Sequence, residues 1–248
     1  DHDLRWGVRL VALSSVEFQT GLRMPLAEIT RRCHANGAEV FVDAIQGLGC
    51  VPMEVVREGV DYLSAGSHKW LMGVEGCGVL YVRNELAKTL KPYTAGWLGH
   101  ENPTGFLFEG EGRLRYDRPL RARADVFENG TFNASGCFAL EASLDGILGL
   151  GVENIHRHAN AYLDALEEGL VRRGFVSLRS RSPEARSCIL GVRPPAGSDV
   201  SAPAMQQSLA RLGVITSVPD GVLRFAPHWP NHPREVEGVL AAVDEILG

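Results

Sequence analysis

A short stretch at residues 39–46, EVFVDAIQ, decides the fold, because its apolar run stops abruptly at a carboxylate, Asp43. A continuous apolar run of this length is typical of a strand buried on both faces of a parallel sheet. The same criterion and helical periodicity predict further elements, namely strands at residues 9–13, 62–65 and 78–82 and helices at 25–36 and 52–58. This alternation predicts an α/β fold, with a mainly parallel sheet and helices on both of its faces.

The second half of the chain is organised differently. Residues 92–123 are rich in Gly, Pro and charge, which is typical of a long functional loop or of a crossing between subunits. Helical periodicity returns at residues 134–150 and 152–173. The remaining predicted elements are strands near residues 188–192 and 222–225 and helices at 202–212 and 233–247. Together they predict a small C-terminal α+β domain.

Composition restricts the class of protein. The 248 residues are 45% hydrophobic and 22% charged, which is ordinary for a globular chain, and the net charge of −5 gives no basic field for nucleic acid. No run of roughly 18 apolar residues predicts a membrane span. Five scattered cysteines without a C-x-x-C pair, and histidines without flanking carboxylates, indicate neither a disulfide framework nor a metal site. We therefore expect a cytoplasmic protein with no metal, no nucleic acid and no membrane as partner.

Asp43 and Lys69 form the pair of residues with the clearest chemical meaning. Asp43 ends a predicted strand and Lys69 follows the next one, so both are expected at the edge where open α/β sheets bind ligands. An acid there keeps a pyridine nitrogen protonated, and a desolvated amine condenses with an aldehyde, which together suggest pyridoxal phosphate chemistry. Taken singly, Asp43 is more simply explained as a turn cap, and Lys69 as a solvated surface lysine, which most lysines are.

Several motifs in order along the chain resemble one enzyme family. They lie at residues 40–46, 61–62, 67–73, 76–81, 127–131 and 223–231. They are similar to the class V aminotransferase family of fold-type I pyridoxal phosphate enzymes, which includes cysteine desulfurases, isopenicillin N epimerase-like proteins and kynureninases. The resemblance implies that residues 1–135 belong to the cofactor-binding large domain, and that residues 136–248 form linking helices and the small domain.

The resemblance also implies a role for each residue at a matching position. Lys69 would be the catalytic Schiff base lysine that forms the internal aldimine. Asp43 would pair with the pyridinium nitrogen, and Gln46 would contact the phenolic oxygen of the cofactor.

The remaining implied contacts concern the phosphate and the substrate. Ser67 and His68 would lie near the phosphate, and Thr131 would reach it from the neighbouring subunit of a homodimer. Trp97 would touch cofactor or substrate, although an aromatic that closes a loop is an equally good interpretation. Arg224 would hold the carboxylate of an amino-acid substrate, against the alternative of a surface ion pair.

The chain departs from the family pattern at identifiable places. Gly66 stands where many desulfurases carry a phosphate-binding Ser, and Phe18 where they carry an Asn. Residues 214–219 lack the cysteine that accepts sulfur, which disfavours a desulfurase. The glycine- and threonine-rich phosphate turn and the ring-stacking residue that precede the Asp strand in the family have no counterpart here. The resemblance thus implies a large domain that is incomplete at its N-terminal side.

Two hypotheses of different classes follow from these observations. The first is a pyridoxal-phosphate-dependent transferase or lyase that acts on an amino acid, with transamination, epimerisation, lyase and hydrolase outcomes left open. The second is a truncated or non-catalytic homologue that serves as an interaction scaffold.

Overall fold

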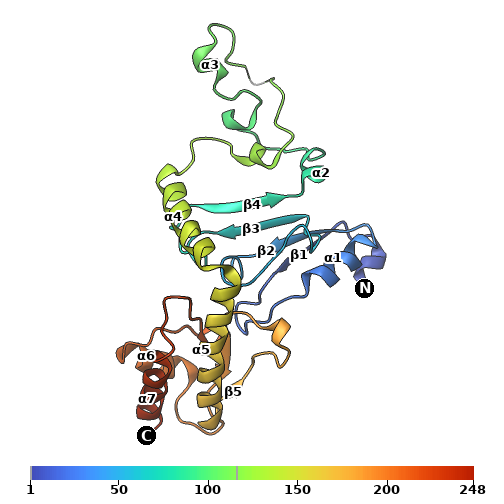
Figure 1. Ribbon diagram of the computed structural model, residues 1–248. Coiled ribbons are helices and arrows are strands. Elements are labelled where there is room, and N and C mark those ends of the chain that lie inside the picture. The colour runs from blue at the N-terminus through green and yellow to red at the C-terminus, as the bar shows by residue number, and fades with distance from the viewer. Residues whose placement is uncertain (1, 116) are drawn as a thin grey trace.

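The computed structural model describes residues 2–115 and 117–248, and its first sheet contains four strands. These are β1 (Leu10–Ser14), β2 (Glu39–Asp43), β3 (Tyr62–Gly66) and β4 (Gly78–Val82), hydrogen-bonded in that order (Figure 1). The first three run parallel, whereas β4 pairs antiparallel with β3. The predicted α/β fold with a mainly parallel sheet is confirmed. The reversal at β4 follows from the short turn of residues 67–77, which is too short for a parallel crossover.

One face of this sheet packs against α1 (Leu26–His34). Val40 and Val42 of β2 are fully buried there, together with Leu26 and Cys33 of the helix. The opposite face is less covered among the described residues. On this face, every second residue of β1 is exposed, β4 follows the same pattern up to its buried last residue, and Leu80 of β4 is 44% exposed.

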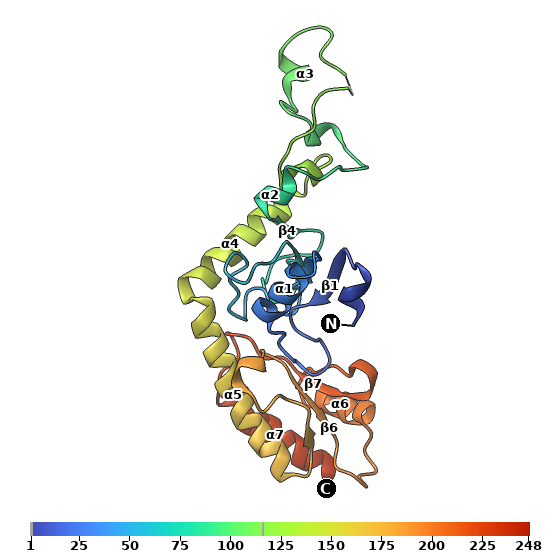
Figure 2. The same ribbon diagram turned by 90° about the vertical axis from the view of Figure 1, so that its right-hand side faces the viewer.

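The connections contain short helical pieces. They are η1 (Asp3–Trp6), α2 (Asn84–Ala87), η2 (Trp97–Gly99), α3 (Gly105–Phe108) and η3 (Ala124–Phe127). The segment around α3 extends away from the sheet (Figure 2). The helix predicted at residues 52–58 is wrong. Residues 52–54 have no regular structure and residues 55–59 form turns, because one bond of helical spacing, from Glu58 N to Glu54 O, is followed at once by Gly59, whose φ is 71°.

Two long helices connect the first sheet to the C-terminal part. α4 (Ala134–Leu150) and α5 (Val152–Arg172) end and begin where helical periodicity predicts, and they meet at a 77° bend. The bend falls on Gly151, with φ 81° and ψ 128°. No single helix among the described residues is long and apolar enough to cross a membrane; α4 and α5 satisfy that criterion only when joined across their bend.

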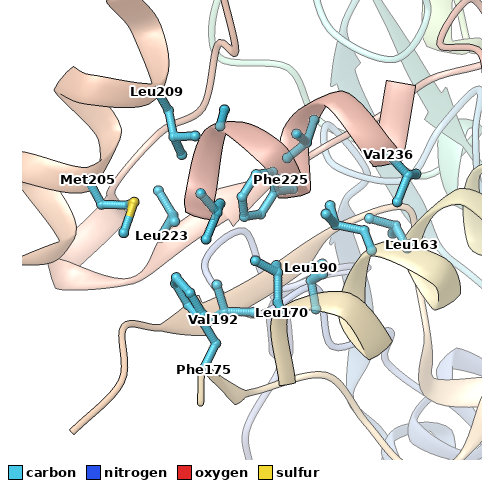
Figure 3. Packing of buried hydrophobic residues seen from close by; sticks show 14 of the residues in the cluster. Leu163, Leu170, Phe175, Leu190, Val192, Met205, Leu209, Leu223, Phe225 and Val236 are labelled. Carbon is cyan, nitrogen blue, oxygen red and sulfur yellow. The ribbon is translucent and has the colours of Figure 1, made fainter. Parts of the chain in front are cut away.

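The second sheet is small and antiparallel. It consists of β5 (Val176–Ser177), β6 (Leu190–Arg193) and β7 (Leu223–Phe225), accompanied by η4 (Pro183–Ala185), α6 (Ala202–Arg211), η5 (Pro219–Gly221) and α7 (Glu235–Leu247). The core between these helices and the sheet contains Leu163, Leu190, Met205 and Leu223, all fully buried (Figure 3). The two-residue strand β5 carries too little pattern to be predicted.

Candidate active site

The ends of β2 and β3 bring the predicted site residues to one edge of the first sheet. β2 ends at Asp43, and its parallel neighbour β3 ends at Gly66. The register pairs Asp43 with Ser64, so the turn that carries Lys69 begins just beyond the same edge. In Figure 1, α4 lies along this edge. The common edge expected from the spacing of the two residues is therefore present.

Asp43 lines a cavity of about 1050 Å³. The walls come from the open face of the sheet, the edge of β4 and the segment around η3; they include Ile45, Ser64, Gly66, Gly78, Leu80, Arg123, Phe127 and Glu128. One carboxylate oxygen of Asp43, Oδ1, accepts the backbone N–H of Ile45 at 2.9 Å. No described contact donates a hydrogen bond to the other carboxylate oxygen of Asp43, Oδ2. The cavity thus combines an anionic oxygen with a partly apolar wall, as small-molecule sites commonly do.

The turn that carries Lys69 is closed by its own backbone. The Gly73 N–H donates to Ser67 O at 2.8 Å, and the buried hydroxyl of Ser67 donates to the carbonyl of Val74. A Cβ on Gly73 would lie 2.8 Å from the Ser67 Cβ, so glycine is required for this closure. Ser67 therefore uses its hydroxyl proton to hold the turn. Its implied contact with a phosphate stays a prediction.

Lys69 itself projects from this turn with an exposed side chain. Its ammonium has no described hydrogen bond or ion pair within residues 2–115 and 117–248, and it does not line the cavity at Asp43. The structure places the two residues at the same edge but does not bring their side chains into contact. Their spacing predicted a common edge, and the proximity of the two functional groups across a bound cofactor stays a prediction.

His68 lies over the end of β3. A Cβ built on Gly66 would come within 2.8 Å of the His68 ring carbon Cε1 and 3.4 Å of the Ile45 side chain. Since Gly66 and Ile45 both line the cavity, the missing methyl group leaves room for the imidazole beside the cavity wall. The departure from the family pattern at Gly66 thus has a steric reason in this chain.

Gln46 is buried one turn beyond Asp43. The indole N–H of Trp70 donates to Gln46 Oε1 at 3.4 Å, and both side chains are less than 10% exposed. With its oxygen engaged, the amide keeps its NH₂ group as the available donor.

Two C-terminal residues that the sequence did not single out clamp the turn from outside. His228 Nε2 lies 2.9 Å from the carbonyl oxygen of Trp70, and the Trp229 indole N–H donates to the sulfur of Met72 at 3.1 Å. His228 Nδ1 accepts the Trp229 backbone N–H, so the neutral imidazole with Nε2–H fits both contacts. Burial lowers the pKa of His228, although its bond to Trp70 opposes the shift. The only sequence signal for a role of His228 and Trp229 was their place in the motif at residues 223–231.

Trp97 and the segment before α4 lie together. The Gly96 N–H donates to Asn129 Oδ1 at 2.8 Å, and the Trp97 ring packs edge-on against Phe106 with centroids 5.9 Å apart. Thr131 follows this contact as an exposed residue just ahead of α4. The structure therefore gives Trp97 a packing role and leaves Thr131 free of described side-chain bonds.

Arg224 occupies the middle of β7 and reaches toward the first sheet. Its Nε donates to Ser217 Oγ at 3.0 Å and Nη1 to the carbonyl of Phe18 at 2.9 Å. Burial lowers the pKa of Arg224, and the charge of Glu17 partly restores it. The described contacts leave Nη2 as the donor still available for a carboxylate.

The described thiols are all free, and none lies at residues 214–219. Within residues 2–115 and 117–248, no group of three or more His, Cys, Asp or Glu side chains is arranged to hold a metal ion.

Comparison with known proteins adds independent findings. Residues 1–214 match the model of the family described as Aminotransferase class-V. An uncharacterized aminotransferase YcbU of Bacillus subtilis (strain 168) is 30% identical over 242 residues, covering 96% of this chain and 58% of that protein. A cysteine desulfurase of Dickeya dadantii (strain 3937) is 33% identical over 178 residues, covering 72% of this chain and 39% of that protein.

The fold has close counterparts among solved structures. The apo structure of a cysteine desulfurase from Thermococcus onnurineus NA1 superimposes with a TM-score of 0.85 at 23% identity, covering 99% of this chain and 61% of the other. At this identity the likeness concerns the fold alone. The chain spans less than two thirds of the length of each of these relatives.

Proposed function

Because this chain belongs to the class V aminotransferase family, whose members depend on pyridoxal phosphate, we propose that its protein is a pyridoxal-phosphate-dependent enzyme that acts on an amino acid. The observation that carries the proposal is the placement of Asp43 and the Lys69 turn at the ends of adjacent parallel strands. Family membership gives the class of chemistry, and this edge supplies the two functional groups that the chemistry needs.

The donor set at the edge fits the cofactor. Asp43 lines the cavity, and one of its oxygens is held by Ile45 while the other has no described donor, which suits a protonated ring nitrogen. Gln46 presents its NH₂ end because Trp70 occupies its oxygen, which suits a phenolic oxygen that accepts. Gly66 lines the cavity without a side chain, and the His68 imidazole lies beside it where a methyl group would stand. We infer that these three positions receive the ring.

Lys69 is proposed to hold the cofactor aldehyde through its amine. Its exposure in the described chain leaves the amine accessible to an incoming aldehyde. When bound, the cofactor supplies a cationic ring that stabilises negative charge at the substrate α-carbon. The Lys69 Nζ would then accept the α-proton and return it, which is general base and general acid work by one amine.

The turn around Lys69 would position this amine. Ser67 fixes the turn from inside through Val74, while His228 fixes it from the C-terminal part through Trp70. His68 stands next to the cavity and is proposed, with Ser67 and with Thr131 of a second copy, to contact the phosphate. Two copies of the chain would share each site in that arrangement.

Arg224 is proposed to bind the substrate carboxylate through its remaining donor, Nη2. The Ser217 and Phe18 contacts hold the guanidinium plane, so that donor is preorganised. Trp97 is proposed to border the substrate space from the segment that packs against Phe106. Transaminase, epimerase and lyase outcomes all fit these groups. Sulfur transfer through residues 214–219 does not, because that loop contains no cysteine.

The chain offers a sharp test because it contains only three lysines, Lys69, Lys88 and Lys91. Pyridoxal phosphate is added to the protein, the product is reduced with borohydride, and peptides are mapped. We expect the adduct on Lys69 and its loss in Lys69→Ala.

Lys88→Ala and Lys91→Ala are matched controls, since both residues lie just beyond α2, outside the site. Both variants should retain the adduct. Equal labelling of all three lysines, or no adduct at all, would favour the interaction scaffold over the enzyme.

A further inference from the structure

Two thiols face each other beside the proposed site. The Sγ atoms of Cys77 and Cys137 lie 4.0 Å apart, although the residues are 60 positions apart in sequence. Cys77 leads into β4, and Cys137 stands in the first turn of α4. Cys137 is exposed and Cys77 is partly exposed, so small molecules in solution can reach the pair.

The pair sits inside a frame of contacts between α4 and the turn that carries Lys69. Ser143 Oγ of α4 donates to the carbonyl of Met72 at 2.9 Å, and Asn133 Nδ2 to that of Gly76 at 3.5 Å. The carbonyl of Cys77 in turn accepts the Ser67 backbone N–H at 3.0 Å. Cys77 is therefore bonded to the Lys69 turn, and Cys137 belongs to the helix that braces it.

Three of the four positions adjacent to the two thiols carry no side chain. Gly76 and Gly78 flank Cys77, and Gly136 precedes Cys137, so no neighbouring side chain stands on these positions. A disulfide needs its sulfur atoms about 2.05 Å apart. Rotation of the two short side chains has to remove the remaining separation of roughly 2 Å.

We propose that Cys77 and Cys137 are a redox-active thiol pair that closes to a disulfide by exchange with a low-molecular-weight disulfide and so ties the Lys69 turn to α4. One protein thiolate attacks a sulfur of the small disulfide, whose S–S bond breaks, and a mixed disulfide forms as the first small thiol leaves. The second protein thiolate attacks the protein sulfur of that mixed disulfide and releases the second small thiol.

The exchange balances without a further reactant. The protein loses two protons and two electrons, and the small disulfide gains them as it becomes two thiols. This assignment does not rest on the proposed function, since it concerns only the thiols and the contacts around them.

Another thiol pair in the chain provides an internal contrast. Cys188 Sγ lies 3.3 Å from the carbonyl of Cys50, and both residues have no exposed surface. Burial raises the pKa of the Cys50 thiol well above its usual range, and Cys188 raises it further. Because a small disulfide cannot reach two thiols that have no exposed surface, this buried pair should stay reduced. Desolvation and Cys77 also raise the pKa of Cys137, so the difference between the two pairs lies in their exposure.

The test uses the purified, reduced protein with oxidised glutathione, followed by acid quenching, alkylation of free thiols and peptide mapping without reductant. We expect one cross-linked peptide pair that contains Cys77 and Cys137, and full reversal by excess dithiothreitol. Cys77→Ser and Cys137→Ser should each carry a single glutathione on the remaining thiol. Cys33→Ala, which alters a buried thiol of α1, should keep the cross-link.

A second measurement does not depend on the folding of any variant. Phenylarsine oxide, which bridges neighbouring thiols, should bind the reduced wild-type protein with a stoichiometry of one, and prior closure of the disulfide should abolish this binding. Closing a loop of this length should also raise Tm, by about 5 °C. Separate glutathione adducts on both thiols of the wild type, a link to Cys50 or Cys188, or links only between protein molecules would each overturn the proposal.

Discussion

The two sheets of this molecule are covered to different degrees. In the second sheet, the first three residues of β6 are fully buried, and three helices, α5, α6 and α7, pack around the core they share (Figure 3). In the first sheet, β1 alternates between exposed and half-buried residues, β4 does the same up to its buried last residue, and Leu80 on the open face is 44% exposed. The sheet with the sealed core contributes stability. The sheet with the open face carries Asp43 and the cavity.

The contrast shows that the implied site residues and the most fully buried core lie mainly in different sheets of this chain. The second sheet contributes one implied site residue, Arg224, which leaves its own core and points toward Phe18. All the other implied site residues lie in residues 43–131, at the edge of the first sheet or in the segment beyond it. Substitutions should therefore affect folding in one sheet and cofactor binding in the other.

The largest expected effect tests the stability side of the comparison. Leu223→Ala removes a side chain with no exposed surface from the second sheet and should lower the free energy of unfolding by about 3 kcal/mol. Leu80→Ala, on the open face of the first sheet, should cost less than about 1 kcal/mol, since little apolar area is lost. Urea denaturation measures both. Equal losses would remove the distinction between the sheets.

The next effect tests the functional side. Asp43→Asn keeps the shape of the residue but removes its charge, and should weaken binding of pyridoxal phosphate roughly 10- to 100-fold, the range for a lost charge-assisted hydrogen bond. Its unfolding free energy should stay within about 0.5 kcal/mol of the wild type. Cofactor absorbance titration and urea denaturation are measured on the same samples. Unchanged affinity would contradict the role of Asp43.

A smaller effect concerns the link between the two regions. His228→Ala loses the bond to the Trp70 carbonyl and should lower the free energy of unfolding by about 1 kcal/mol. The lowered pKa of His228 also determines how stability changes with pH, because the unfolded chain binds the proton more readily than the folded one.

This stability contribution is complete above the unfolded pKa of about 6.5 and declines as the pH falls from there toward the folded pKa. Urea midpoints measured across this range should show a weaker pH dependence for His228→Ala than for the wild type. Identical profiles would mean that another group titrates in this window, for example His156, whose pKa burial also lowers.

The smallest effect lies on the open face itself. Tyr62 donates to Glu39 Oε2 at 2.9 Å, and desolvation together with this bond raises the pKa of Tyr62 to about 12. The folded state then holds the phenolic proton more tightly, so its stability contribution is present below about pH 10 and is lost as the pH rises toward 12. Tyr62→Phe should cost about 0.5 kcal/mol at neutral pH. Ultraviolet titration should show a late-titrating tyrosine that this variant lacks, beside Tyr162, whose pKa burial also raises.

Much of the fold could be predicted because local signals agreed with tertiary packing. The end of the buried strand at Asp43 and the break between the long helices at Gly151 follow from the apolar run and from glycine. The direction of β4 was not predicted from its strand pattern, which carries no sign of parallel or antiparallel pairing; the short connection of residues 67–77 is the signal that favours an antiparallel return. The helix expected at residues 52–58 failed because neighbouring Pro52 and Gly59 limited it to turns.

The site was predictable in position and less so in contacts. The strand order places Asp43 and Lys69 at one edge, but backbone spacing does not fix where a long, flexible side chain points. Hydrogen bonds such as those from His228 to Trp70 and from Arg224 to Phe18 join residues 158 and 206 positions apart. No local pattern encodes pairings of this range, so they emerge only from the folded chain.

The 77° corner at Gly151 has a mechanical consequence. α5 comprises 21 residues and is thus about 31 Å long, so a rotation of roughly 2° at the corner would displace its far end by about 1 Å. A small change of the angle is therefore amplified along α5, and it occurs at a single residue, Gly151, that has no side chain. Ile147 of α4 and Ile155 of α5 are buried in the same cluster, one on either side of Gly151, and their packing stabilises the angle.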